Sequence, residues 1–278
     1  MIHRIPGAIV RALLIVIMLA TPALMLPGES SDATQATVFV GLFAGALTFA
    51  EYASTYPGLI EFRYAPPFNR LRFLSLFFTV FLLTMICRNP IDPTPFSAFV
   101  EAVGALIGRA IDLPYRPVRL MTLMLPTDTS AAHLDLVRTA AGMAYLISLV
   151  MLAIFVVVLK LFRWPANHGA FNVWVNLPTF DPTAGGDVVT RLERDARFNI
   201  ALGFLLPFLV PAVVKASSTS FQPITFESAQ TLIWTVAAWA FLPASLFMRG
   251  IAMGRIADMI RERRRQNAEG EDGAFQAI

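Results

Sequence analysis

Long hydrophobic stretches alternate with short polar segments along the chain, and six of them approach the length needed to cross a lipid bilayer. A spanning helix needs about 20 predominantly apolar residues. The third stretch is the shortest and begins beside Arg72, whereas the fourth has no charge between Arg138 and Lys160. The predicted fold class is an all-α polytopic membrane helix bundle with spans over residues 9–26, 37–56, 71–87, 139–162, 198–214 and 229–248.

The first stretch has a second interpretation, as a signal peptide. It follows a basic start and contains the small-residue pattern Ala20-Thr21-Pro22-Ala23, which is typical of a cleavage site. The apolar residues continue past that pattern through Leu24 and Leu26. An uncleaved helix is therefore the favoured interpretation.

Residues 96–111 form an amphipathic pattern between the third and fourth spans. Apolar residues such as Phe99 and Val103 recur at helical spacing, with polar residues toward the other side. Glu101 and Arg109 argue against a seventh span. The pattern predicts a helix that lies on the outer membrane surface or re-enters the membrane.

The distribution of basic residues predicts the orientation. Cytoplasmic segments of membrane proteins are enriched in Lys and Arg. With six spans and a cytoplasmic N-terminus, most of the 22 Lys and Arg residues fall on the cytoplasmic side, including those in a loop over residues 163–197. Arginine also greatly outnumbers lysine, which is a compositional hint of a bacterial source. The predicted location is the bacterial inner membrane, with both termini cytoplasmic.

Pairs of glycines four residues apart are candidates for helix packing. Such pairs remove side chains from one stripe of a helix and allow a neighbouring backbone to approach closely. Gly41 and Gly45 form the most credible pair because Thr48 extends the same face, and Gly250 and Gly254 form another. Such pairs serve packing within one chain and contact with another chain alike, so the spacing predicts a helix contact of either kind.

Glu51 is the single acidic residue clearly within a predicted span. A charge there is costly and is often functional. Its position near the end of the span favours a buried ion pair or polar site with Arg11 or Arg72. A role in proton or solute movement, or simple exposure at the interface, are the alternatives.

The C-terminal segment is basic and then acidic. Anionic headgroups stabilise basic residues that lie close to the membrane surface. We therefore expect the last helix to continue past the membrane and place a basic run on the headgroups or on an acidic partner. The run comprises Arg261, Arg263, Arg264 and Arg265, and residues 267–278 are predicted to be a flexible acidic tail.

Composition supports the membrane assignment and excludes several classes of function. Hydrophobic residues make up 56% of the chain and charged residues 15%, whereas a soluble domain carries roughly a quarter charged residues. The net charge is +3, and the basic residues lie at the ends of apolar stretches and in the C-terminal run. This distribution favours a membrane surface over nucleic acid as partner. Cys87 is the one cysteine and the three histidines are scattered, so no disulfide, metal site or cofactor is predicted.

No catalytic motif is recognisable, so two non-catalytic functions remain. The favoured one is an accessory, assembly or scaffold subunit of a larger inner-membrane complex, in contact with other membrane protein subunits. The alternative is a permease or channel for a small solute. A shortage of polar groups in the middle of the spans argues against ion coupling.

Overall fold

The computed structural model describes residues 4–28, 31–55, 58–165, 172–181, 183, 185–217 and 226–276, and within these ranges the chain is helical and contains no strand. Six helices (α1, α2, α3, α6, α8 and α9) are long and apolar enough to cross a membrane, which confirms the predicted fold class. The elements are α1 (Ile5–Met25), α2 (Ser31–Ala53), α3 (Phe68–Arg88), α4 (Pro95–Ile111), α5 (Pro117–Leu123), α6 (Ala131–Leu161), α7 (Val173–Asn176), α8 (Val188–Ser217) and α9 (Ala229–Gln276).

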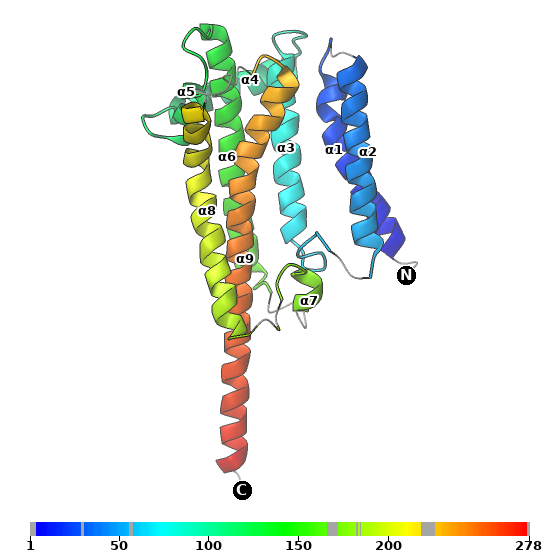
Figure 1. Cartoon of the computed structure of the whole chain (residues 1–278), viewed down its shortest axis with the longest axis vertical. Coiled ribbons are helices and arrows are strands. Elements are labelled where there is room, and N and C mark those ends of the chain that lie inside the picture. The colour runs from blue at the N-terminus through cyan, green and yellow to red at the C-terminus, as the bar shows by residue number, and fades with distance from the viewer. Residues whose placement is uncertain are drawn as a thin grey trace.

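The long helices run alternately up and down between two ends of a bundle (Figure 1). The N-terminus, the connection before α3, α7 and the projecting part of α9 all lie at one end, called here the terminal end. The short helices α4 and α5 lie at the opposite end. Helix α9 packs against α8, α6 and α3, whereas α1 and α2 pack mainly on each other.

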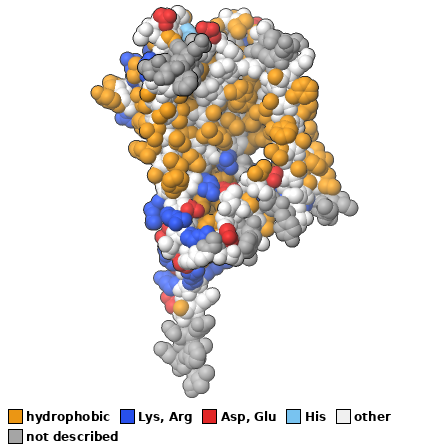
Figure 2. Space-filling model, in the orientation of Figure 1, with side chains coloured by type: hydrophobic (Ala, Val, Ile, Leu, Met, Phe, Trp, Pro, Cys, Tyr) orange, Lys and Arg blue, Asp and Glu red, His pale blue; other side chains and the backbone are white. Residues whose placement is uncertain are grey.

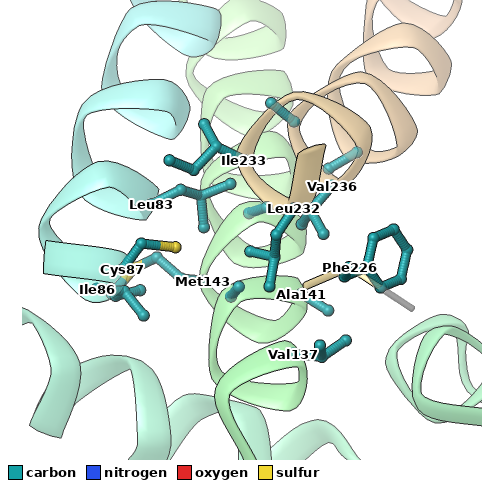
Figure 3. Packing of buried hydrophobic residues seen from close by; sticks show 14 of the residues in the cluster. Leu83, Ile86, Cys87, Val137, Ala141, Met143, Phe226, Leu232, Ile233 and Val236 are labelled. Carbon is teal, nitrogen blue, oxygen red and sulfur yellow. The ribbon is translucent and has the colours of Figure 1, made fainter. Parts of the chain in front are cut away.

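One apolar cluster fills the bundle toward the opposite end. Figure 3 shows Leu83 and Ile86 of α3 meeting Met143 of α6 and Leu232 and Ile233 of α9. Lipid tails are as apolar as these side chains, so helices in a bilayer associate mainly through close van der Waals packing. Small residues on α6 and α9 permit this packing, namely Ala140, Ala141, Ala144, Ala237 and Ala240.

A second apolar cluster holds the terminal end together. Phe62 and Trp164 of the connecting segments pack with Phe155 of α6 and with residues of α9 such as Met253 and Ile256. The ring centroids of Phe62 and Trp164 lie 6.1 Å apart. This cluster fixes the segment between α2 and α3 against the rest of the bundle.

The amphipathic helix is α4, and it crosses α6 with the two backbones in contact. A Cβ atom placed on Gly142 would lie 2.5 Å from the Cα atom of Gly108. Thr94 caps the helix by accepting a hydrogen bond from the Ser97 backbone at 3.1 Å, and Ser97 completes a capping box. Phe99 on the flank of α4 remains exposed.

Several helices extend beyond the predicted spans, because hydropathy identifies only the apolar part of a helix. Helix α8 begins at Val188, inside the predicted loop, since Val189 and Leu192 bury a face against the second cluster. Helix α9 continues to Gln276, so residues 267–276 are helical where a flexible tail was predicted. Pairs such as Arg265 and Glu269, four residues apart, favour helix in a polar segment.

Candidate functional site

A cavity of about 960 Å³ opens at the terminal end between the α1–α2 pair and the rest of the bundle. Its size falls within the range of about 300–1,000 Å³ that is usual for small-molecule sites. Helices α1, α2, α3, α8 and α9 and the segment 59–66 contribute to its wall. Figure 2 shows that this face of the molecule is hollowed between two groups of hydrophobic side chains.

The polar part of the wall is strongly basic. Glu61 is the one acidic residue among the described lining residues, which include five arginines. The cavity therefore carries a net positive charge in a region of low dielectric, where electrostatic attraction is stronger than in water. The five are Arg11, Arg63, Arg70, Arg72 and Arg249.

Glu61 and Arg249 form a two-pronged ion pair across the cavity wall. The carboxylate of Glu61 accepts hydrogen bonds from Arg249 Nε at 2.6 Å and from Arg249 Nη2 at 2.8 Å. The hydroxyl of Thr179 donates a third hydrogen bond to Glu61 at 2.6 Å. Burial opposes ionisation of Glu61, but these hydrogen bonds and the charges of Arg249 and Arg72 outweigh it and lower the pKa of the carboxyl.

Arg72 lies in the same cavity without a comparable partner. Its guanidinium carbon is 5.2 Å from the ring centroid of Phe68 and 6.0 Å from that of Phe241. Within the described residues its buried Nε atom has no hydrogen-bond partner. A largely buried charge in a membrane span is energetically costly and is a candidate for function. The two rings contact this cation without forming an ion pair with it.

Arg63 and Arg11 differ in how many protein groups bind their guanidinium groups. Arg63 is 6% exposed and donates hydrogen bonds to the backbone oxygens of Glu51 and Thr55, so it terminates α2. Arg11 is exposed, donates to the Gly7 carbonyl at 2.7 Å and lies over a tyrosine ring of α2. Arg63 is thus mainly structural, whereas Arg11 contacts its own helix and Tyr52 of α2.

Glu51, the acidic residue selected from the sequence, lies in a different environment from the one predicted. Its carboxylate accepts hydrogen bonds from the backbone N–H groups of Gly58, Leu59 and Ile60, at 3.0 to 3.2 Å. These contacts fold the chain into a turn after α2. Arg11 and Arg72, the partners predicted for Glu51, both line one cavity, but the acidic residue that lines it with them is Glu61.

Sequence reasoning missed Glu61 and Arg249. Glu61 lies in a connection between two predicted spans, and Arg249 follows the last one, so both resemble ordinary interfacial charges. Their positions next to apolar spans gave no local signal of a pair. Only the packing of α9 beside the segment before α3 brings them together.

Comparison with known proteins supplies no relative. No protein-family model, curated protein or solved structure matches the chain.

The predicted glycine pairs all face helices of the same chain. A Cβ on Gly45 would lie 2.6 Å from Val16 Cγ2 of α1, and one on Gly41 would lie 3.8 Å from Leu19. A Cβ on Gly250 would lie 2.7 Å from the Ala196 carbonyl oxygen of α8. Gly254 lies on the same contact, with Ala196 Cβ at 4.0 Å, and Thr48 donates to the Ala44 carbonyl and lines the cavity.

The basic run of α9 joins the start of α8. Arg261 pairs with Glu193, and Arg264 Nη1 lies 2.6 Å from Asp187 Oδ1. The hydrogen bond from Arg264 lowers the pKa of Asp187, with the Thr190 backbone contributing. Arg265 pairs with Glu262 at 3.0 Å, and Arg263 lies on the same exposed stretch. The helix projects away from the bundle along its axis (Figure 1).

Proposed function

We propose that this integral membrane protein is non-catalytic and binds an organic anion in the arginine-lined cavity. The observation that carries this proposal is the set of five arginines around one glutamate in a cavity of about 960 Å³. Arginine presents several donors in a planar fork that matches carboxylate and phosphate groups, and it stays protonated in proteins. Such groups favour binding and orientation of an anion over acid–base catalysis.

The apolar cluster favours binding over free passage through the bundle. Leu76 lines the inner part of the cavity and also packs against the cluster around Leu83 and Ile233. This cluster fills the bundle between the cavity and the opposite end. A permease, the alternative considered from the sequence, would have to open this packing during each transport cycle.

Binding can be tested with the purified protein in an uncharged detergent. We expect organic carboxylates and phosphates to raise the unfolding temperature, because a ligand at 100 times its Kd stabilises the folded state by about 2.7 kcal/mol. Arg72→Gln should greatly reduce the response. Arg197→Gln, an exposed change outside the cavity on α8, is the matched control. Equal responses of wild type and Arg72→Gln would contradict the proposal.

The orientation proposed with this function places the terminal end in the cytoplasm of a bacterium, at the inner membrane. It is supported by the excess of Lys and Arg at that end. A cytoplasm-active reporter fused after Ile278 should be active, and the same reporter inserted after Asp128, between α5 and α6, should be inactive. The reverse pattern would contradict this orientation.

A second candidate function is that of a subunit in a larger membrane assembly. It is supported by α2, which packs along α1 but makes no comparable contact with another described helix. Phe39 and Phe43 on this helix are each more than two-thirds exposed, so lipid or another protein must cover them. The glycine pairs face helices of this chain and therefore do not indicate a partner subunit. The exposed face of α2 around Phe39 and Phe43 does support one.

Cysteine cross-linking can distinguish protein from lipid on this face. Cys87 is buried, so a new surface cysteine would be the main accessible thiol. Phe43→Cys should form cross-links to a specific partner in native membranes, while Phe204→Cys on the exposed face of α8 serves as control. Equal and non-specific labelling of both positions would argue against the subunit function.

A further inference from the structure

The cavity wall has a basic zone and an apolar zone at different depths. Arg11 lies nearer the terminal end than Met18 on α1, and Arg249 lies nearer that end than Phe241 on α9. Arg72 lies at the boundary between the two zones, with its guanidinium carbon 6.0 Å from the Phe241 ring centroid. Along α1 the rise from Arg11 to Met18 is about 10 Å, and along α9 the rise from Arg249 to Phe241 is about 12 Å. One leaflet of a bilayer contributes about 15 Å of hydrocarbon. The two zones thus match the headgroup and acyl-chain regions of a single leaflet.

The cavity also opens sideways at membrane depth. Two of its lining residues, Leu14 of α1 and Leu242 of α9, are apolar and are 41% and 55% exposed. Helices α1 and α9 both line the cavity but make few contacts with each other. The hollow in Figure 2 lies on the face where these helices stand apart. A lipid could enter here without leaving the bilayer.

The charges favour an anionic headgroup over a zwitterionic one. A phosphodiester can accept two parallel hydrogen bonds from a guanidinium, and Arg72 lines the cavity without an ion pair to any described residue. Arg11 lies on the opposite wall, on α1, and Arg70 adds a further positive charge. A choline or ethanolamine group would bring its own cation into this basic zone, where like charges repel.

We infer that the ligand of this cavity is an anionic glycerophospholipid, held by its phosphate at Arg72 and Arg11 and by its acyl chain along the apolar inner wall. This inference rests on the proposed function and narrows the organic anion to a membrane lipid. A soluble phosphate ester carries the same phosphate group and could bind the same arginines. The sideways opening and the apolar zone are what select the lipid.

The test is native mass spectrometry of the whole protein in an uncharged detergent, titrated separately with three probes. These are dioleoyl phosphatidylglycerol, dioleoyl phosphatidylcholine and glycerol 3-phosphate. We expect retention of phosphatidylglycerol, weak retention of phosphatidylcholine and no retention of glycerol 3-phosphate. Arg72→Gln should weaken phosphatidylglycerol binding roughly tenfold or more, as expected for loss of a charged hydrogen bond. Arg197→Gln should bind as wild type does.

A second variant keeps the test independent of the buried arginine. Leu242→Trp enlarges an exposed side chain at the sideways opening and should weaken phosphatidylglycerol binding while leaving the unfolding temperature near that of wild type. Equal binding of both lipids, or no effect of either variant, would overturn the inference. Binding of glycerol 3-phosphate as tight as that of phosphatidylglycerol would overturn the lipid assignment and leave the proposed function standing. Failure of every anion to bind would overturn both.

Discussion

Arg249 donates two hydrogen bonds to Glu61 across 188 positions of sequence, and the pair joins the segment before α3 to the membrane part of α9. The side chain of Glu61 is 12% exposed and that of Arg249 is 26% exposed. The pair has two roles in the proposed site: it fixes the cavity wall, and it neutralises one of the arginines. Both roles can be measured.

Glu61→Gln should destabilise the fold and strengthen anion binding. Loss of one partner of a buried pair costs about 3–5 kcal/mol, and the partial exposure of Arg249 reduces the expected loss to about 2 kcal/mol. The freed Arg249 would add to the positive charge of the cavity. Thermal unfolding and anion titration measure the two effects. Glu262→Gln, in an exposed pair with Arg265, is the control and should change neither.

The same pair predicts how stability depends on pH. The pKa of Glu61 is lowered in the folded protein, so its contribution is fully present above the pKa of the unfolded carboxyl. It is lost as the pH falls through the lower folded-state value. Unfolding temperatures measured from pH 7 down to about 3.5 should decline below about pH 4.3, the usual value for a glutamate. Glu61→Gln should show a shallower decline, and parallel curves would contradict the assignment.

Gly142→Ala should disrupt the crossing of α4 over α6. The new methyl carbon would lie 2.5 Å from Gly108 Cα, which is backbone and has no rotamer that could move away. Overpacking of this kind costs about 1–3 kcal/mol. Gly41→Ala is the matched control in another span, because its Cβ would meet Leu19 at an ordinary 3.8 Å. Equal unfolding temperatures for the two variants would show that the crossing is looser than described.

Asp112→Asn should loosen the opposite end of the bundle. The carboxylate of Asp112, with 10% of its side chain exposed, lies 2.7 Å from Arg138 Nε and 3.5 Å from Arg119 Nη1. It thereby joins the end of α4 to α5 and α6. We expect a loss of about 1–3 kcal/mol, since Arg138 loses the charge of one carboxylate partner and keeps only its pair with Asp135 among the described residues. Hydrogen exchange should increase in α4 and α5, whereas Asp92→Asn, in a half-exposed pair with Arg88, should leave exchange there unchanged.

The sequence by itself determined the six spans and the amphipathic helix over residues 96–111. Their signals are hydropathy and helical spacing, which are properties of neighbouring residues and survive without knowledge of the packing. It did not determine the ends of α6, α8 and α9, because polar helical turns beyond a membrane segment carry no hydropathy signal. The positions of Gly41 and Gly250 were readable as helix contacts, but their partner helices were not.

Only the tertiary structure decided which charges meet. Glu51 was selected because it lies within an apolar stretch, yet its carboxylate is occupied by the backbone of the following turn. Glu61 was indistinguishable from any interfacial acid until α9 placed Arg249 beside it. Hydropathy depends on the identity of each residue and its neighbours in the chain. An ion pair between distant residues depends on how whole helices pack, and that arrangement is fixed by the sum of many contacts that no local pattern contains.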